Sequence, residues 1–495
     1  MNFKFPTPYS VLMGVILVAA IATWILPAGQ YDTITYLENS DTFELRSAGE
    51  TTTLPANQQT LDELGILIQL DKFKEGEFTK PLSVPDTYKT VESDPQGILD
   101  VFLAPIKGMY QVIDIVMLVL IIGGFIGVFN SSGALDRGVS YLARILKGRE
   151  SLLIVIVTSL IAIGGTTFGM AEETLAFYPI LVPVFLAAGY DLLVPVAVIF
   201  IGSSIGTMAS TTNPFATIIA SNAAGINWTI GLYSRLAMLI LGTIVSITYI
   251  VRYANRAKKD PTKSLLYGLN IHSPFKDIDT SASSHLDLKT VLLLSLFGGT
   301  FLFMIIGVAF YGWWLEEMTV LFLIASILLG ILMRSSEKEF VAHFIDGAKD
   351  LLGVSLIIGI ARGVTIIMND GMISDTILYY SVQMVEGTSG FVFLPLLLVV
   401  FFVMGFFISS SSGLAVVSMP IMSSLAQIIG VPVEEIVNAY QFGFGIMLFI
   451  TPAGLILPSL AMVNVNYDKW IKFIWPLLVI LAFLSLLTLW AGLLI

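Results

Sequence analysis

The stretch Gly164–Asn222 decides the fold. It places two polar, glycine-rich segments, GGTTFGMAEETLAFYP (Gly164–Pro179) and GSSIGTMASTTNPFA (Gly202–Ala216), inside very apolar sequence. Irregular backbone at membrane depth survives only where protein covers it or where it lines a wet cavity. Two carboxylates, Glu172 and Glu173, lie in the first segment, and an ionisable residue within a membrane segment indicates a functional site. The alternative interpretation of such a polar segment, when it is considered alone, is a loop outside the bilayer.

The composition predicts an all-α polytopic membrane protein. Of the 495 residues, 56% are hydrophobic and only 12% are charged, which excludes an ordinary soluble domain. The chain has no cysteine, so it has no disulfides. It also lacks a P-loop, an H-E-x-x-H pair and a G-x-S-x-G motif, so we expect neither an ATP-driven pump nor an enzyme. We expect no cofactor and, without a basic tract, no nucleic-acid partner.

The order of apolar and polar segments predicts the domains. Residues 1–27 predict a first transmembrane helix and 28–107 a small, acidic, partly β extracytoplasmic domain. We expect four further parts: membrane repeat 1 (108–251) with a hairpin at 151–190, a cytoplasmic linker (252–290), scaffold helices (291–345), and membrane repeat 2 (346–495) with a hairpin at 391–429. The arms of each hairpin are short for a full span, which needs about 20 residues, so we expect both hairpins to be re-entrant.

An internal repeat supports this interpretation. A shift of about 239 positions places Gly108 on Gly347, Gly124 on Gly363, Asn130 on Asn369 and Asp136 on Asp375. The polar tip at Glu172 falls on the serine run Ser409–Ser412, and Thr212–Pro214 falls near FITPAG (Phe449–Gly454). Both halves therefore predict the same order: helix, interfacial helix, short-armed hairpin, broken helix and helix.

Loop charge predicts the orientation, because short cytoplasmic loops carry an excess of Lys and Arg. With the N-terminus inside and both hairpins returning to the side they enter from, the basic loops 131–150, 252–263, 334–349 and 466–472 all fall inside. Segment 111–129 then runs inward and its mate, 351–368, runs outward, so the repeats are inverted. We expect nine spanning helices and an extracytoplasmic C-terminus, in the bacterial cytoplasmic (inner) membrane.

Inverted repeats bring hairpin tips and helix breaks together near the middle of the membrane. Helix N-termini there suit carboxylates, while hydroxyls and helix C-termini suit Na⁺ or an ammonium group. The polar residues of the tips and breaks are therefore our candidate substrate- or ion-binding residues: Thr166, Thr167, Glu172, Glu173, Ser203, Ser204, Thr207, Thr211, Thr212, Asn213, Arg362, Ser409, Ser410, Ser411, Ser412, Gly413 and Thr451. We expect Na⁺ or H⁺ as the coupling ion, with Na⁺ near Glu173, Thr212 and Ser411.

The charged candidates each have a structural alternative. Glu172 and Glu173 point about 100° apart on a helix, so one of them can face the cavity and bind a cation, an ammonium group or a proton. The alternative is a helix cap or an ion pair with Arg362. Arg362 can hold a substrate carboxylate bidentately or serve a structural role. The pair Trp313–Trp314 indicates an anchor at the membrane interface rather than a ligand site.

Several stretches resemble the YfcC family of anaerobic C4-dicarboxylate-carrier-like proteins, within the ion transporter superfamily. They are WILPAGQYD (Trp24–Asp32), VPDTYKTVESDPQGILDVFLAPIKG (Val84–Gly108), FGMAEETLAFYPILVPVFLAAGYD (Phe168–Asp191) and GSSIGTMASTTNPFATIIAS (Gly202–Ser221). The resemblance covers nearly the whole chain and implies an elevator-type secondary transporter, usually a homodimer, often named as a basic amino acid antiporter. Related branches carry dicarboxylates. The Ser-Asn-Thr signature of the sodium-dependent relatives is absent from the first tip, which reads Ala171-Glu172-Glu173-Thr174.

These observations predict a secondary active transporter of a small amino acid, which works by ion coupling or by exchange. An antiporter of basic amino acids is the specific form that the family resemblance implies. A transporter of a C4-dicarboxylate or another small carboxylate is the first alternative. An ion channel is a more remote one, because no repeated filter motif accompanies the broken helices. The expected partners are the small-molecule substrate, the lipid bilayer and a second copy of the chain.

Overall fold

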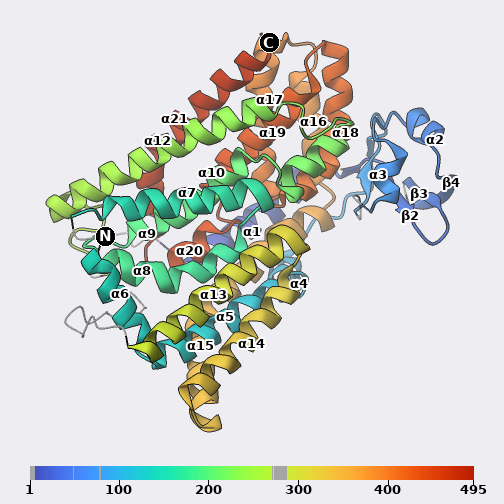
Figure 1. Ribbon diagram of the computed structural model, residues 1–495. Coiled ribbons are helices and arrows are strands. Elements are labelled where there is room, and N and C mark those ends of the chain that lie inside the picture. The colour runs from blue at the N-terminus through green and yellow to red at the C-terminus, as the bar shows by residue number, and fades with distance from the viewer. Residues whose placement is uncertain are drawn as a thin grey trace.

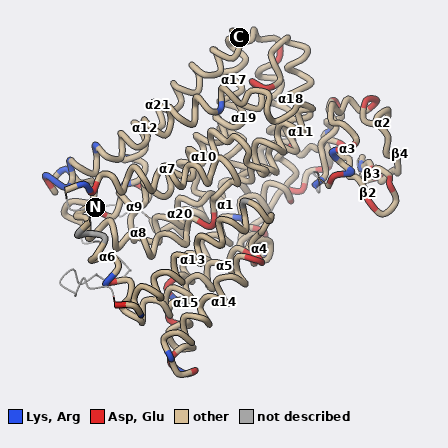
Figure 2. Tube along the Cα trace, in the orientation of Figure 1, with Lys and Arg blue, Asp and Glu red and all other residues tan. Residues whose placement is uncertain are grey.

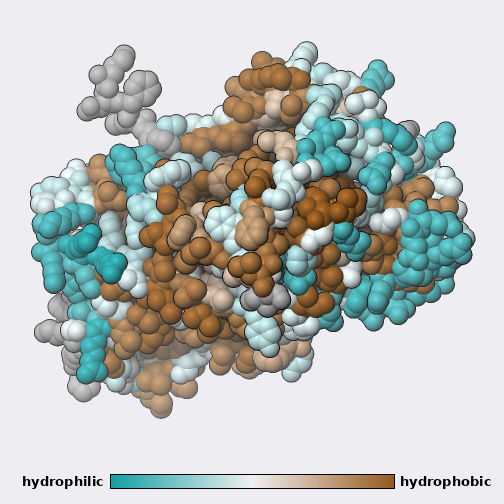
Figure 3. Space-filling view, turned by 90° about the horizontal axis from the view of Figure 1, so that it is seen from above, coloured by the Kyte–Doolittle hydropathy of each residue, from teal (hydrophilic) through white to brown (hydrophobic). Residues whose placement is uncertain are grey.

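The computed structural model describes residues 6–47, 49–76, 78, 80–145, 148–269, 271 and 287–494. Within these residues, ten helices are long and apolar enough to cross a membrane. A hydrophobic band runs across the middle of the molecule and hydrophilic residues gather at its two ends (Figure 3). The chain is therefore a helical, multi-pass membrane protein.

A small mixed domain follows the first helix, α1 (Pro8–Ile25), and projects from one end of the molecule (Figure 1). Its elements are β1 (Gly29–Gln30), β2 (Thr33–Leu37), β3 (Thr42–Ser47), β4 (Glu50–Pro55), α2 (Gln58–Glu63), α3 (Leu70–Lys74), β5 (Leu82–Ser83) and β6 (Lys89–Thr90). The strands form an antiparallel sheet in the order β4-β3-β2-β5 and a separate β1-β6 pair. Ile34 and Phe43 of the sheet and Leu61 of α2 are fully buried, and they belong to one cluster of buried residues that continues into the membrane helices.

The first half of the membrane part consists of helices, and two of its helical segments are interrupted by non-helical backbone. Its elements are α4 (Ile98–Gln111), α5 (Ile113–Ser131), α6 (Ala134–Ile145), α7 (Ser151–Phe168), η1 (Glu172–Phe177), α8 (Tyr178–Ala187), α9 (Leu193–Val196), η2 (Ala197–Ile201), α10 (Gly202–Met208), η3 (Pro214–Ile218), α11 (Ile219–Ala223), α12 (Leu232–Lys259) and η4 (Pro261–Lys263). The chain leaves helical geometry between α7 and η1, and again between α10 and η3. These interruptions coincide with the two polar segments that the sequence contains.

The second half repeats this order after two additional helices. Its elements are α13 (Leu288–Tyr311), α14 (Leu315–Met333), α15 (Glu337–Asp370), α16 (Ser374–Val385), α17 (Gly390–Phe407), α18 (Ser411–Ile429), α19 (Val433–Leu448), α20 (Ile456–Ala461) and α21 (Tyr467–Gly492). Three of the ten apolar helices, α7, α17 and α18, are arms of the predicted hairpins. The broken helices α9–α11 and α19–α20 are not among the ten, because each is interrupted.

Close glycine contacts join α15 to α4 and α5. A Cβ on Gly108 would lie 2.5 Å from the carbonyl oxygen of Gly359 and 2.9 Å from the nitrogen of Gly363. On the other side of the same interface, Gly347 lies against the backbone of Gly123 and Gly127. Only residues without a side chain allow helix backbones to approach so closely. The predicted shift carries Gly108 to Gly347, and each of these two glycines lies at a close contact between α15 and the α4–α5 segment.

The two ends of segment 151–190 meet at the C-terminal end of α12. The Lys258 ammonium forms an ion pair with Glu150 at 3.2 Å and donates to the carbonyl of Ala188 at 2.8 Å. The chain therefore returns to the end of the molecule at which α7 begins. Lys and Arg side chains gather at this end (Figure 2).

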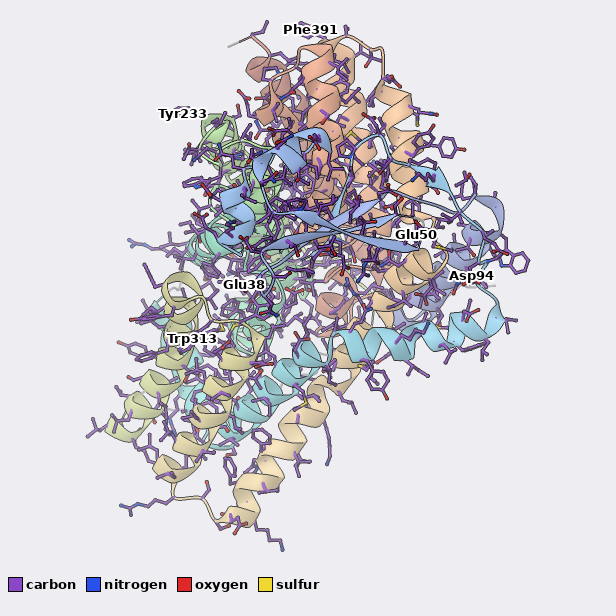
Figure 4. The ribbon with its side chains drawn as sticks, turned by 90° about the vertical axis from the view of Figure 1, so that its right-hand side faces the viewer. Glu38, Glu50, Asp94, Tyr233, Trp313 and Phe391 are labelled. Carbon is purple, nitrogen blue, oxygen red and sulfur yellow. The ribbon has the colours of Figure 1, made fainter. Side chains whose placement is uncertain are left out.

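The two ends of segment 391–429 meet at the opposite end of the molecule. A Cβ on Gly390 would lie 3.3 Å from Val431 and 3.6 Å from Leu493, which follows α21. Helices α12 and α21 run antiparallel, because Phe473 near the start of α21 packs against Tyr249 and Tyr253 near the end of α12. In Figure 4 the small domain lies in front of the membrane helices, with Phe391 and Tyr233 above it and Trp313 below it.

Two predicted boundaries fall inside helices. The boundary at 107 lies within α4, which begins where Asp100 accepts a hydrogen bond from the Gly97 nitrogen at 2.9 Å. The boundary at 345 lies within the 34-residue α15, which begins at a capping box formed by Ser336 and Glu339. The basic sequence around it is therefore helical rather than a loop. Residues 270 and 272–286 of the predicted linker lie outside the described residues.

Candidate functional site

The first tip, Gly169–Thr174, reverses the chain between α7 and α8. Gly169 ends α7 with φ +77°, and a Cβ there would lie 2.8 Å from the side-chain amide of Asn213. Only glycine satisfies both constraints. The 3-10 helix η1 then starts with the two carboxylates. Glu173 is 5% exposed and accepts a hydrogen bond from the Ala171 nitrogen at 2.9 Å, so the turn itself holds this carboxylate in place.

The break in the helix α9–α11, between α10 and η3, is hydrogen-bonded to the end of α7. The Thr166 hydroxyl donates to the carbonyl of Ala209 at 2.8 Å and accepts from the Thr211 nitrogen at 3.0 Å. The Thr166 carbonyl accepts from the nitrogens of Thr211 and Thr212, each at 3.1 Å. The unwound backbone is thus satisfied by the neighbouring helix, as an irregular segment at membrane depth requires.

The second tip, Ser409–Ser412, starts α18. The Ser410 hydroxyl caps this helix by accepting from the Gly413 nitrogen at 3.2 Å. The Ser411 hydroxyl donates to the carbonyl of Phe215 at 3.1 Å, and the Ser411 carbonyl accepts from Tyr440 at 2.7 Å. The second tip therefore contacts the helix break of the first half directly.

A cavity of about 380 Å³ lies where the two tips and the broken helices converge. This volume lies in the range of small-molecule sites. Eleven of the predicted site residues line it: Glu172, Glu173, Ser203, Ser204, Thr207, Asn213, Arg362, Ser409, Ser410, Ser411 and Ser412. The first half supplies both carboxylates and the second half supplies the guanidinium and the serines. The cavity is therefore shared between the two halves.

Six predicted residues do not line this cavity. They are Thr166, Thr167, Thr211, Thr212, Gly413 and Thr451. The hydroxyl of Thr212 donates to the carbonyl of Thr167 at 3.2 Å, and Thr167 donates to the carbonyl of Ile163 at 2.7 Å. The hydroxyls of Thr212 and Thr167 are therefore used in hydrogen bonds to backbone carbonyls next to the first tip. Sequence alone does not separate a hydroxyl that faces a cavity from one that satisfies backbone.

The cavity also contains residues that the sequence analysis missed. They are Lys80, Gln111, Asp114, Phe215 and Trp314, among others. Asp114 lies at the start of an apolar helix, so the rule that singled out Glu172 could have found it. Trp314 was expected to be an interface anchor, but it lines the cavity and its ring lies 4.7 Å from that of Phe215. Lys80 carries no sequence signal, because it comes from the small domain.

Opposite charges share this cavity without a direct ion pair among the described residues. The guanidinium of Arg362 donates to the side chain of Gln111 at 3.1 Å. The predicted alternative of an Arg362–Glu172 ion pair is therefore not formed in this conformation. The site offers both carboxylates and cationic groups to a ligand, a combination that suits a zwitterion or a carboxylate.

The second large cavity lacks this chemistry. It measures about 420 Å³ and lies between α1, α15 and α20, where Asp350 is its one charged lining residue. No group of three or more His, Cys, Asp or Glu side chains that could hold a metal occurs in the described part of the chain. The cavity between the tips is thus the better candidate site.

The fold and this site define a multi-pass membrane transporter, and comparison with known proteins identifies its family. The family model of DcuC, the C4-dicarboxylate anaerobic carrier, matches residues 5–493, so the chain belongs to this family. An uncharacterised protein of Haemophilus influenzae is 41% identical over 483 residues, covering 96% of this chain and 94% of that protein. The Escherichia coli protein named "Putative basic amino acid antiporter YfcC" is 26% identical over 491 residues, covering 95% and 93%.

Two solved transporter structures are also similar. The YdaH transporter of Alcanivorax borkumensis has a TM-score of 0.41 at 17% identity, and 98% of each chain is covered. The Neisseria gonorrhoeae efflux pump MtrF has a TM-score of 0.40 at 15% identity, covering 99% of this chain and 95% of that one. TM-scores this low do not establish a shared fold, so the family assignment rests on the sequence match.

Proposed function

We propose that the chain is a secondary active transporter that carries a small amino acid across the bacterial cytoplasmic membrane, by ion coupling or exchange. The carboxylates of the cavity suit the ammonium group of such a substrate, and Arg362 together with the N-terminus of α18 suits its carboxylate. The YfcC relative, named as an antiporter of basic amino acids, supports exchange. A C4-dicarboxylate is the second candidate, supported by the family description and by the cationic groups.

One observation carries the proposal. The two tips belong to segments whose ends lie at opposite ends of the molecule, yet Glu173 and Ser411 line one cavity. A site between two oppositely oriented halves can be exposed to either side by moving one part against the other. An ion channel would instead need a continuous pore.

We further propose that segments 151–190 and 391–429 are re-entrant hairpins of inverted repeats. With α1, α5, the two broken helices, α12, α13, α14, α15 and α21 as spanning elements, nine spans place the N-terminus in the cytoplasm and the C-terminus outside. The small domain is then extracytoplasmic. The scaffold helices would hold a homodimer while the hairpins and broken helices slide as an elevator. Lys and Arg at the end opposite the small domain support this orientation (Figure 2).

Either Na⁺ or H⁺ can serve as the coupling ion in this proposal. Glu173 and Ser411 offer oxygens to Na⁺ from the cavity wall, whereas Thr212, which we expected beside them, does not line the cavity. A proton would bind a carboxylate of the first tip. Both ions give a cationic partner to a buried acid, so the geometry is compatible with either one.

The test is uptake by proteoliposomes of the purified protein. Labelled L-arginine and succinate would each be supplied under a Na⁺ gradient, under a pH gradient, or with the unlabelled compound inside. Saturable uptake of L-arginine or succinate under one of these conditions is expected. Flux of neither, or single-channel currents in a planar bilayer, would contradict the proposal.

A further inference from the structure

We propose that Lys80 of the small domain is a substrate-contacting residue, which binds a carboxylate group of the substrate together with Arg362. The proposal rests on the transport function above and adds a part of the chain that lies outside the membrane helices. The side chain of Lys80 lines the cavity, and its ammonium donates to the Ser412 hydroxyl at 3.1 Å. Lys80 is also exposed, so it lies where the cavity meets the solvent.

The small domain is docked in a way that fixes this position. Strand β5, two residues after Lys80, packs against α18, and its Leu82 and Ser83 are buried. The small domain also contacts α16. The ring of its Tyr88 stacks on that of Tyr379 in α16 with 4.0 Å between the ring centres, and the Tyr88 hydroxyl lies 3.0 Å from the hydroxyl of Thr376 in the same helix. Lys80 is therefore held at the second tip by a domain that makes several contacts with the membrane helices.

The charges around Lys80 leave it ready for an anion. Among the described residues, neither Lys80 nor Arg362 has a carboxylate within ion-pair distance. Partial burial and the positive charge of Arg362 both lower the pKa of Lys80, so the two cations lie in each other's field. A bound carboxylate between them would relieve this repulsion and gain charge-assisted hydrogen bonds. L-arginine and succinate both carry a carboxylate, so the role does not depend on which one is carried.

The first experiment compares the uptake kinetics of three variants with those of the wild type. Lys80→Gln removes the charge, Lys80→Arg keeps it, and Lys74→Gln removes a lysine of the same domain that pairs with Asp41 at 3.1 Å on the surface. For the probe that the wild type carries, Lys80→Gln should raise KM about tenfold or more with little change in kcat, the usual effect of losing a charge-assisted hydrogen bond. Lys80→Arg should restore KM, and Lys74→Gln should leave it unchanged.

The Ser412→Ala variant tests whether Lys80 binds the substrate or only holds the second tip in place. This variant removes the hydroxyl that Lys80 contacts and leaves the ammonium in place. If Lys80 binds substrate by its charge, Ser412→Ala should raise KM clearly less than Lys80→Gln does. Equal effects of the two substitutions, with kcat reduced in both, would mean that Lys80 only positions the tip and would overturn the proposal.

A second measurement uses the absence of cysteine from the chain. Lys80→Cys and Lys74→Cys would each be labelled in proteoliposomes with a membrane-impermeant thiol reagent, with and without the transported probe. The probe should slow the labelling of position 80 several-fold and leave position 74 unaffected. Wild-type uptake with an unchanged KM in Lys80→Gln, or no protection of position 80, overturns this inference alone. Absence of wild-type uptake overturns the transport function and this inference together.

Discussion

The hydroxyl of Ser411 donates to the carbonyl of Phe215, which lies 196 positions earlier in the chain. Ser411 starts α18 in the second half and Phe215 follows the helix break in the first half, so this bond joins the two halves at the candidate site. The Tyr440 hydroxyl donates to the carbonyl of Ser411 at 2.7 Å and holds the serine from the other side. Both hydrogen bonds therefore hold the second tip against the helix break, beside the packing of α18 on α11 and η3.

We expect Glu173→Gln to abolish uptake or to remove its dependence on the coupling ion. Glutamine keeps the size of the side chain and an acceptor for the Ala171 nitrogen, so the turn stays intact and the negative charge is lost. Uptake in proteoliposomes under Na⁺ and pH gradients checks this. Glu337→Gln, at the exposed start of α15, is the matched control and should behave as the wild type. An unchanged rate with unchanged ion dependence would remove Glu173 from the site.

Gly108→Ala should destabilise the protein by about 1–3 kcal/mol, the usual cost of overpacking a tight contact. The added Cβ would lie 2.5 Å from the carbonyl oxygen of Gly359, and neither helix backbone can move without disturbing the rest of the α4–α15 interface. The melting temperature in detergent measures the effect. Gly298→Ala in α13, where no atom lies within 4 Å, should leave it unchanged or raise it slightly. Equal melting temperatures for the two variants would mean that α4 and α15 do not pack as described.

Thr166→Ala should lower stability without raising KM in the folded fraction. The substitution leaves the Ala209 carbonyl without its hydroxyl partner, at about 1–3 kcal/mol for a buried group, while the Thr211 nitrogen keeps only its bond to the Thr166 carbonyl. Thr167→Ala is the control, because the Thr167 hydroxyl bonds to carbonyls of its own helix, of which that of Ile163 lies closest. Thermal melting and uptake normalised to folded protein distinguish the outcomes. A raised KM at normal stability would place Thr166 in the binding site after all.

Asp375 should make the docking of the small domain depend on pH. Burial raises the pKa of Asp375 to about 6, against the effect of the Tyr31 nitrogen, which donates to its carboxylate at 3.0 Å. The folded protein therefore holds this proton more tightly than the unfolded chain, whose Asp titrates near pH 3.9. Stability from this group is fully present below that pH and is lost as the pH rises through about 6, by about 3 kcal/mol in all. Melting temperatures should rise from pH 7 to pH 5 in the wild type, and Asp375→Asn should show a weaker rise. The same slope in both would contradict this assignment.

The positions of apolar runs and of the polar segments between them predict much of this fold, because a polar segment inside apolar sequence can adopt only a few structures in a membrane. The two tips, the breaks near Thr212 and Thr451 and the order of elements in each half all follow from that constraint. The continuous α15 was not predicted, since Lys338 and Lys349 made its first turns resemble a basic loop. The N-cap residues Gly97 and Ser336 determine where α4 and α15 begin. The sequence analysis placed the boundaries by the charge of the segments and did not use these local capping signals.

The candidate site was predicted less completely, because lining a cavity is a property of side-chain direction and long-range contact. Thr166 and Thr211 contact each other and the backbone, while Thr207, on the same broken helix as Thr211, lines the cavity, and Ser203 lines it and also donates to the Met170 carbonyl. Hydroxyl content does not separate these two groups. Lys80 lies 332 positions from Ser412 in a separate domain, and no pattern in the sequence joins them. Its place in the site appears only when the small domain is docked.

A disulfide between the two halves should block transport reversibly. Ser411→Cys and Phe215→Cys, introduced together into a chain without other cysteines, would place thiols on two residues that touch through the Ser411 hydroxyl and the Phe215 carbonyl at 3.1 Å. If substrate reaches the cavity only when the second tip moves off the helix break, oxidation should abolish uptake and a reductant should restore it. Each single variant should be insensitive to both treatments, which excludes oxidative damage elsewhere. Complete disulfide formation, shown by mass spectrometry, together with undiminished uptake would mean that the tip and the break move as one unit and that access lies elsewhere.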